Sequence, residues 1–338
     1  MEFPGKNKKA IGIIIILILI VSGLYLNYFR DRKDRLYTKI EYFMDTRVMI
    51  KVAKKPGVEK DVKDTFQEMK KWSKKLDRYD AVSTISKINE TNKYVEVSPD
   101  IFSLVKMCYN YSELSNGAFD ITISPLLDLW GFGKGDYRIP LEQELNRCLT
   151  LVNYKEIKFD ENNNRIFLPK NMSLDLGGAA KGFIIDKGIK KLKRNGYKSI
   201  YINAGGNIRV VGKKITEDTP WKIGIKKPND TNQIFEQYIV NVSTGSLATS
   251  GDYERYFTRD GKRYSHLIDP RTGHQSSELE SVTIYAPTAL QADILSTTVF
   301  IMGNKEGKDL IRNSPEIEGF LVNGDELWSS EGFKKLVY

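Results

Sequence analysis

Apolar residues recur with the period of an α-helix in several parts of the chain. Between Val58 and Leu76 they fall at steps of three and four, which predicts an amphipathic helix over this stretch. Ser98 followed by Pro99 is typical of a helix start, and the apolar stripe after it predicts a helix that runs to about Leu114. Further helices are expected over residues 140–152 and 290–302, and another is expected to follow Gly177 and Gly178 and to run to about Arg194. A short helix is expected to follow residue 302.

Short apolar runs bounded by turn residues predict the strands. One strand is expected from Tyr42 to Val52, and residues 157–159 and 165–168 are expected to form a hairpin around Asn162–Asn164. Further strands are expected at 173–176, 199–203, 208–211, 221–225, 236–242 and 281–285, and two more close the chain. Because helices and strands are mixed without a regular βαβ alternation, we expect an α+β fold with a mixed sheet in a single catalytic domain.

The N-terminal segment has a different pattern. No charged residue occurs from Ala10 to Phe29, and about 20 helical residues at about 1.5 Å each reach roughly 30 Å, the thickness of a bilayer core. No A-x-A-like cleavage site follows, so an uncleaved anchor is favoured over a signal peptide. We therefore expect a basic N-terminus at 1–9, a transmembrane anchor at 10–29, a linker at 30–40 and the catalytic domain at 41–338. Basic residues flank both ends of the span, so charge does not fix its orientation.

The net charge of +9 is partly concentrated before residue 36, where seven basic residues face three acidic ones. The rest is spread along the chain without a basic stripe, which argues against nucleic acid as a partner. Cys108 and Cys148 are the only cysteines, and neither has a metal-binding spacing. They are expected to be buried free thiols, with a disulfide between them as the alternative.

Candidate chemistry is concentrated in the segment Ser265–Gly273. It contains His266, Asp269 and Arg271 beside two turn dipeptides, and His274, the only other histidine, follows directly. Histidine titrates near neutral pH and is a natural proton carrier. A polar surface hairpin is the alternative for this segment taken alone.

Glycines mark a second candidate site at Leu174–Gly182. Backbone N–H groups at such a helix start suit a phosphate, and Lys181 adds a positive charge, although the spacing is neither a Walker A loop nor a Rossmann fingerprint. Glycines that serve only packing are the alternative. Phe119, Trp130 and Phe132 are suited either to stacking on a flat ring or to the core.

Asp293 and Thr297 lie four residues apart on a predicted helix and so share one face. A carboxylate with a hydroxyl suits Mg²⁺, which prefers oxygen ligands and keeps waters and substrate phosphates in its shell. An aspartate on the helix surface beside a threonine is the alternative.

Taken together and in order, these motifs resemble those of the ApbE-type FAD:protein FMN transferases. The resemblance runs from about Tyr42 to the C-terminus. It rests on Met44–Thr46, Tyr79 with Ser86–Asn89, Gly117–Asp120, Asp175–Gly182, Asn203–Gly206, Thr249–Tyr253, Ser265–Gly273 and Ala292–Thr297.

The resemblance implies an ApbE, T-fold-like architecture and assigns roles to individual residues. It places Asp293 and Thr297 where the family holds Mg²⁺, with the backbone carbonyl of Gly178 as a further ligand. Our own hypothesis for the catalytic residues is that His266 assists proton transfer or holds the pyrophosphate, and that Asp293 orients the metal. The resemblance also places eight residues where the family contacts FAD: Met44, Tyr79, Ala118, Phe119, Asp120, Asp175, Lys181 and Ile268. From their chemistry and their place in Ser265–Gly273, we expect His266 and Arg271 to face the phosphates of FAD.

The implied reaction is the Mg²⁺-dependent transfer of FMN from the substrate FAD to a threonine of an acceptor flavoprotein that carries a D-x-x-[ST]-G-A-[ST] sequence, with release of AMP. The expected location is the cell membrane, with the catalytic domain outside. Two alternatives stay open: a Mg²⁺-dependent FAD pyrophosphatase, and a membrane-tethered flavin-binding protein without enzymatic activity.

Overall fold

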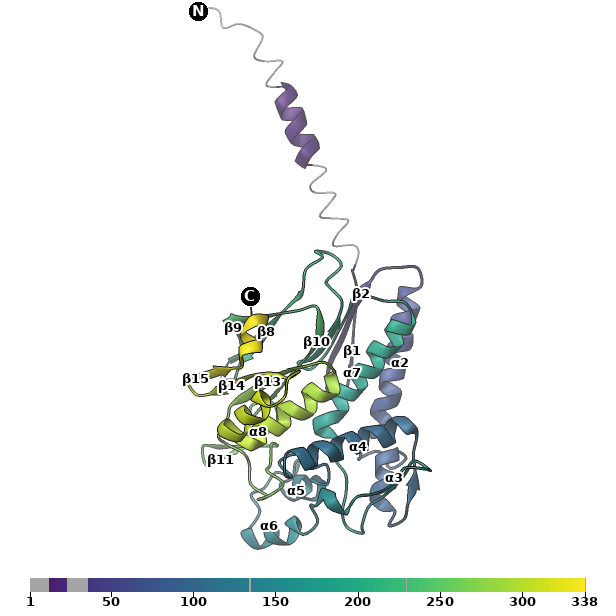
Figure 1. Ribbon diagram of the computed structural model, residues 1–338, viewed down its shortest axis with the longest axis vertical. Coiled ribbons are helices and arrows are strands. Elements are labelled where there is room, and N and C mark those ends of the chain that lie inside the picture. The colour runs from purple at the N-terminus through teal and green to yellow at the C-terminus, as the bar shows by residue number, and fades with distance from the viewer. Residues whose placement is uncertain (1–11, 23–35, 134, 229, 338) are drawn as a thin grey trace, which may run out of the picture.

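A computed structural model describes residues 12–22, 36–133, 135–228 and 230–337 (Figure 1). Its centre is an eight-stranded sheet with the order β1-β2-β6-β7-β10-β13-β14-β15, and every neighbouring pair is antiparallel. The expectation of a mixed sheet was therefore wrong, since hairpins rather than parallel crossovers join many of the neighbours. The strands are β1 Leu36–Phe43, β2 Thr46–Ala53, β6 Ile200–Ala204, β7 Asn207–Val211, β10 Thr244–Gly251, β13 Ser281–Ala286, β14 Glu318–Asn323 and β15 Glu326–Ser329.

Two strands replace the single strand that was expected from Tyr42 to Val52. The chain turns at Met44 and Asp45, both of which have φ of 55° in the left-handed region, and a hairpin results. The first strand begins at Leu36, inside the stretch that was expected to be linker. This hairpin forms one edge of the sheet and brings Met44 to its end.

Helices cover one face of the sheet (Figure 1). Helices α7 (Gly177–Arg194) and α8 (Ala289–Arg312) pack on the central strands, and α2 (Val58–Leu76) packs against α7. The bounds of α2 and of α4 (Pro99–Leu114) confirm the predictions from apolar periodicity. Helix α8 is interrupted at Gly303, whose φ of 79° breaks the helical path.

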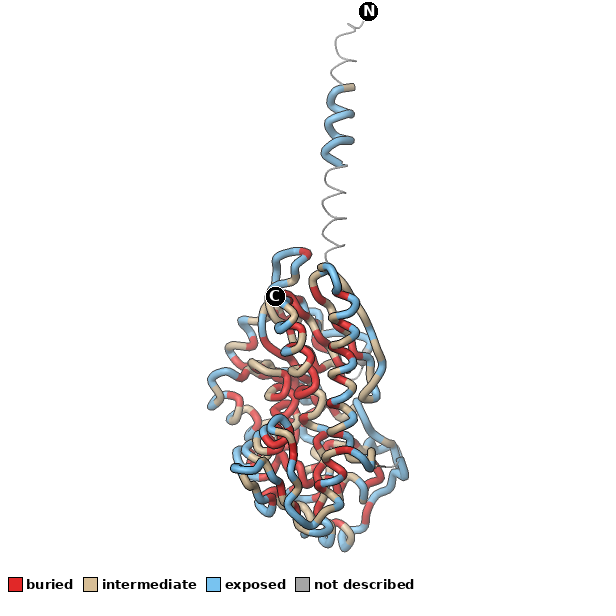
Figure 2. Tube along the Cα trace, turned by 90° about the vertical axis from the view of Figure 1, so that its right-hand side faces the viewer, coloured by how far each residue is buried: buried red, intermediate tan, exposed pale blue. Residues whose placement is uncertain are grey.

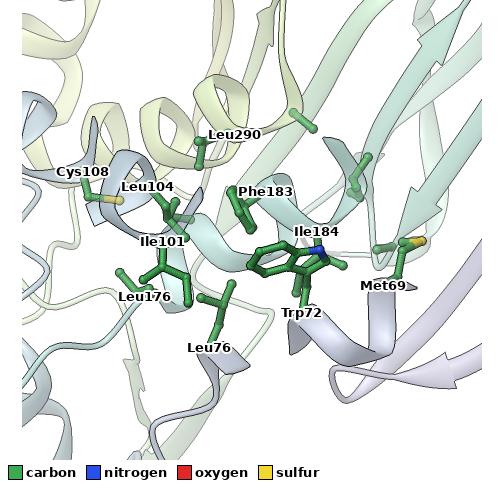
Figure 3. Close-up of a cluster of buried hydrophobic side chains, with 14 of the residues drawn as sticks. Met69, Trp72, Leu76, Ile101, Leu104, Cys108, Leu176, Phe183, Ile184 and Leu290 are labelled. Carbon is green, nitrogen blue, oxygen red and sulfur yellow. The ribbon is translucent and has the colours of Figure 1, made fainter. Parts of the chain in front are cut away.

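The core between these helices is aromatic and aliphatic (Figure 3). Trp72 of α2 meets Phe183 of α7 edge to face, with ring centroids 5.3 Å apart. Met69 and Leu76 of α2 and Leu104 of α4 belong to the same buried cluster. This packing fixes the start of α7 relative to the end of α2.

A smaller layer covers the opposite face of the sheet. Strands β8 (Trp221–Lys227) and β9 (Asp230–Val242) form a separate ribbon, and its apolar residues cluster with those of β7, β10 and β14 and with α9 (Glu331–Leu336). The sheet therefore has an apolar layer on each face, which explains why its central strands are buried on both sides.

The remaining elements surround one end of the sheet. They are α3 Thr84–Glu90, β3 Val95–Glu96, α5 Ser124–Leu129, α6 Glu142–Leu149, a 3₁₀ turn at Tyr154–Glu156, β4 Lys158–Asp160, β5 Arg165–Phe167, β11 Tyr256–Arg259 and β12 Lys262–Ser265. The predicted hairpin of β4 and β5 is confirmed, whereas α6 is shorter than predicted.

No strand forms at residues 173–176, where one was expected. Only an isolated bridge joins Ser173 to Ile123. The side chain of Asn89 takes the place of a neighbouring strand, because its Oδ1 accepts from the N–H of Leu174 at 2.7 Å and its Nδ2 donates to the carbonyl of Leu174 at 3.0 Å.

Residues 12–22 are helical, and the large apolar side chains from Ile13 to Val21 are 52–66% exposed (Figure 2). The rest of the expected anchor at 10–29, the N-terminus at 1–9 and linker residues 30–35 lie outside the described residues. Within the described ranges, no helix has the length and apolarity needed to cross a bilayer. Cys108 is buried and Cys148 is half-buried, and both are free thiols, so no disulfide joins them.

Candidate active site

A cavity of about 450 Å³ opens beside the first turns of α7 and α8. Its volume lies within the range of roughly 300–1,000 Å³ that is usual for small-molecule sites. Twelve of the thirteen residues singled out from the sequence line it: Met44, Tyr79, Ala118, Phe119, Asp120, Asp175, Gly178, Lys181, His266, Ile268, Asp293 and Thr297. Residues far apart in the sequence thus meet in one site, and only Arg271 lies elsewhere.

Asp293 joins the two helices to the sheet. Its Oδ2 accepts from the backbone N–H of Gly182 in α7 at 2.8 Å, and its Oδ1 accepts from Nδ2 of Asn207 in β7 at 2.7 Å. Burial raises the pKa of this carboxyl, while the nearby Lys181 ammonium and the two hydrogen bonds act in the opposite direction. Each carboxylate oxygen keeps a second lone pair for another partner.

Thr297 lies one turn further along α8, on the same side as Asp293. Its Oγ1 lies 3.2 Å from Oγ of Ser250, which also bonds Oγ of Ser296 at 2.9 Å. Gly178 faces it, because a Cβ on this glycine would lie 3.4 Å from Oγ1 of Thr297 and 3.2 Å from the ring of Phe119. The absence of a side chain at Gly178 therefore keeps the space beside Thr297 open.

These oxygen donors suit Mg²⁺. Asp293 supplies a carboxylate and Thr297 supplies a hydroxyl, and oxygen ligands of this type are the ones that Mg²⁺ prefers. No group of three or more His, Cys, Asp or Glu side chains with metal-binding geometry occurs among the described residues.

Asp120 is used within the protein. Its Oδ1 accepts from the N–H and Oγ1 of Thr122, both at 2.7 Å, and its Oδ2 accepts from the N–H of Tyr154 at 2.9 Å. Burial raises the pKa of this carboxyl, and the three hydrogen bonds counteract that shift. Asp120 therefore shapes the loop that presents Ala118 and Phe119 to the cavity.

Arg78 is a cavity residue that the sequence did not reveal. Its guanidinium binds both carboxylate oxygens of Asp128, at 2.7 and 3.0 Å, and Oγ of Ser124 at 2.6 Å, and it contacts Asp175. The guanidinium also lies 4.3 Å from the ring centre of Tyr79. The two aspartates hold the pKa of Arg78 above its ordinary value despite burial. Arg78 thus fixes Tyr79 and Asp175 against the same wall.

His266 is held by a backbone carbonyl. Its Nδ1 lies 3.1 Å from the carbonyl oxygen of Arg255, which can only accept a hydrogen bond, so Nδ1 carries the proton. Burial, assisted by the positive charges of Arg255 and Lys181, lowers the pKa of His266 to about 4. The imidazole is therefore neutral at pH 7, with an unprotonated Nε2.

Arg271 is paired with two acids. It turns back onto Asp269, with its Nε and Nη2 each 2.9 Å from a carboxylate oxygen, and its Nη1 lies 3.7 Å from Glu306. Two acids thus neutralise its charge, and Arg271 does not line the cavity, so its contact with FAD stays a prediction. His274 lies 3.5 Å from Glu142 and does not line the cavity.

The three aromatic residues separate into two roles. Phe119 and Phe132 line the cavity, whereas the indole N–H of Trp130 donates to the carbonyl of Gly273 at 2.8 Å and so holds the end of the segment 265–273. Glu254 is a further cavity residue that was not predicted. Burial raises the pKa of its carboxyl, and Lys181 counteracts this effect.

Comparison with known proteins gives a consistent result. The model of the ApbE family matches residues 44–321. The chain belongs to this family. ApbE relatives named FAD:protein FMN transferase include one from Haemophilus influenzae, 32% identical over 79% of this chain and 81% of its own length, and one from Klebsiella pneumoniae, 32% identical over 88% and 93%.

Solved ApbE structures have the same fold. The crystal structure of the ApbE protein from Thermotoga maritima superposes with a TM-score of 0.84 at 34% identity, over 90% of this chain and 99% of that one. The flavin transferase ApbE from Vibrio cholerae gives a TM-score of 0.80 at 27% identity, over 89% and 99%. The α+β architecture expected from the resemblance is confirmed.

Proposed function

We propose that this protein is an FAD:protein FMN transferase that moves FMN from FAD to a threonine hydroxyl of an acceptor protein. The observation that carries the proposal is the meeting of the ordered family motifs in one cavity, in a chain that matches relatives of that name over most of its length. The cavity offers aromatic and aliphatic walls for a flavin, and Lys181 for phosphate charge.

In the proposed reaction, the threonine oxygen forms a bond to the phosphorus on the FMN side of FAD. The anhydride bond breaks, AMP leaves with the bridging oxygen, and the hydroxyl proton passes to a base. The unprotonated Nε2 of His266 is suited to receive that proton, and Lys181 is suited to offset charge on the phosphates. Such positioning and charge stabilisation supply most of the catalysis in phosphoryl transfer.

The proposed metal site consists of Asp293, Thr297 and the carbonyl of Gly178. Bound Mg²⁺ would neutralise the charge on the pyrophosphate that builds up as the anhydride bond breaks. The hydrogen bonds from Gly182 and Asn207 fix the orientation of the Asp293 carboxylate, which supports its proposed role as a ligand. Because the ligands lie on both α7 and α8, the distance between these helices determines the geometry of the site.

Intact mass measurement of an acceptor tests the proposal. The protein is incubated with FAD, Mg²⁺ and an acceptor domain that carries the D-x-x-[ST]-G-A-[ST] sequence. The expected result is an acceptor with one FMN added, which is lost when Asp293→Asn replaces the wild type. Free FMN and AMP with an unmodified acceptor would instead identify a pyrophosphatase. FAD binding without any product, or FMN attached to this chain itself, would favour a flavin-binding protein.

We also propose that the N-terminal segment anchors the protein in the cell membrane with the catalytic domain outside. The uncharged sequence from Ala10 to Phe29 and the exposed apolar side chains of Ile13–Val21 support this location. Protease treatment of intact cells is expected to release the catalytic domain. A domain that remains protected until the cells are lysed would overturn the proposed orientation.

A further inference from the structure

A second cavity, of about 680 Å³, adjoins the candidate active site. The two cavities share five lining residues: Met44, Asp45, Lys181, Thr249 and Glu254. A group bound in the second cavity therefore meets the first cavity at Lys181, beside the proposed phosphate site. A transferase with two substrates needs such a junction, since the attacking oxygen must reach the phosphorus of the other substrate.

The second cavity runs along an edge of strand β8. Four consecutive residues of this strand, Ile223–Lys226, line it. Because side chains alternate between the two faces of a strand, four consecutive lining residues indicate that the backbone edge itself borders the cavity. Within the described strands β8 pairs only with β9, and Ile225 has no partner in their register. The cavity therefore borders backbone groups that lie outside a regular ladder.

We propose that this cavity, the acceptor groove, binds the acceptor protein as an extended segment that pairs with the edge of β8 and delivers its threonine to the active site. The proposal rests on the proposed function, because it supplies the second substrate of that reaction. An extended chain suits the groove, since main-chain hydrogen bonds to a strand edge provide affinity and alternate side chains enter pockets.

The lining of the groove fits a peptide better than a second nucleotide. Apolar side chains of the central sheet and β8, among them Met49, Ile208 and Leu247, line it and suit alternate side chains of an extended peptide. Charges of both signs border it, with Arg47 and Lys226 against Asp45 and Glu254. Mixed charge and apolar pockets suit a polypeptide, whereas a pyrophosphate favours a uniformly basic site.

Lys226 offers a test with a matched control on the same strand. Lys226 and Lys222 are both exposed on β8, but only Lys226 lines the groove. The expected result for Lys226→Glu is a rise of about tenfold in KM for the acceptor domain with the D-x-x-T-G-A-T sequence. The dissociation constant for FAD, followed by flavin fluorescence, is expected to stay unchanged. Lys222→Glu is expected to leave both constants at their wild-type values.

Photocrosslinking provides a readout that does not depend on transfer. A benzophenone amino acid at position 226 is expected to crosslink to the acceptor domain on irradiation, and the same group at position 222 is not.

If the wild type transfers FMN but Lys226→Glu has a normal KM and position 226 gives no crosslink, the groove assignment is wrong. Weaker FAD binding in Lys226→Glu would assign the cavity to FAD, and a crosslink to a second copy of this chain would make it a dimer contact. If the wild type transfers no FMN, the proposed function fails, while the crosslink still decides whether the acceptor occupies the groove.

Discussion

Nε of Arg78 lies 2.6 Å from Oδ2 of Asp175, and Oδ1 of the same carboxylate accepts from the backbone N–H of Gly177 at 2.6 Å. Gly177 is the first residue of α7, so Arg78 holds the start of this helix through Asp175. The arginine follows the end of α2 closely in the sequence. One side chain thus connects the packing of α2 to the position of the glycines and Lys181 at the candidate active site.

Removal of Arg78 is expected to lower both stability and FAD affinity. Arg78→Met leaves Asp175 without its cation, and for this partly buried ion pair we expect a loss of about 2 kcal/mol, between the values for exposed and fully buried pairs. Urea unfolding measures this loss, and titration with FAD measures the change in affinity. The control is Arg138→Met, which breaks the more exposed pair with Glu144 and is expected to cost less than about 1 kcal/mol. Equal losses in the two variants would contradict the structural role of Arg78.

Replacement of Thr297 tests the metal site. Thr297→Val keeps the shape of the side chain and removes its oxygen, while Ser250 retains its bond to Ser296. We expect the free energy of unfolding to change by less than about 1.5 kcal/mol, because the net contribution of one hydrogen bond to stability is about that much or less. FMN transfer is expected to fall about 100-fold, and the stabilisation of the wild type by added Mg²⁺, seen in thermal melts, is expected to disappear. Thr297→Ser is the control and is expected to retain both. Wild-type transfer by the valine variant would exclude Thr297 as a ligand.

His266 is expected to make stability depend on pH. The folded protein keeps its imidazole neutral down to a pKa of about 4, whereas the unfolded chain binds a proton near the ordinary value of about 6.5. Between these values the unfolded state binds more protons, so stability falls as the pH is lowered from about 6.5 to about 4. The difference between the melting curves of the wild type and of His266→Gln across this pH range measures the contribution of His266 to the pH dependence of stability. The prediction is wrong if the two profiles run parallel.

The same substitution is expected to reduce FMN transfer at pH 7. General base catalysis contributes about 100-fold or more, so kcat of His266→Gln is expected to fall by that order. His274→Gln is the matched control, because His274 lies outside the cavity beside Glu142. Intact mass of the acceptor over time measures both rates. Full activity of His266→Gln would assign His266 to the cavity wall alone.

Deletion of residues 1–35 tests the anchor. The truncated protein begins at Leu36, the first residue of β1, so the described sheet stays complete. We expect the full chain to sediment with membranes and to resist alkaline extraction, and the truncated protein to remain in the supernatant with an unchanged rate of FMN transfer. Recovery of the full chain in the supernatant would exclude the anchor.

Strong periodicity allowed several elements to be predicted with close bounds. Helix α2 has apolar residues at steps of three and four, and its predicted limits, Val58 and Leu76, are those of the structure.

Strand β10 was missed because its sequence has no hydrophobic periodicity. Its sequence, TGSLATSG, is small and polar, yet most of it is buried between β7 and β13 under α8. Close packing of α8 on this strand, including the contacts of Ser250, requires small residues that carry no hydrophobic pattern.

The candidate site was predictable where the chemistry was local. Asp293 and Thr297 follow from helical spacing, whereas the partners of Arg78 are distant in the sequence; Asp128 is 50 residues away. No local pattern indicates such a contact, so Arg78 was missed. The position of Arg271 was not predictable either, because its cation binds Asp269, two residues before it, and its expected contact with phosphate stays a prediction.

The wall shared by the two cavities has a consequence for the order of bond making and breaking. With FAD in one cavity and the acceptor in the other, both substrates are bound at once, and the phosphorus passes directly from one oxygen to the other. A single in-line displacement inverts the configuration at phosphorus. An FAD analogue that is chiral at the FMN phosphorus is therefore expected to give acceptor-linked FMN of the opposite handedness.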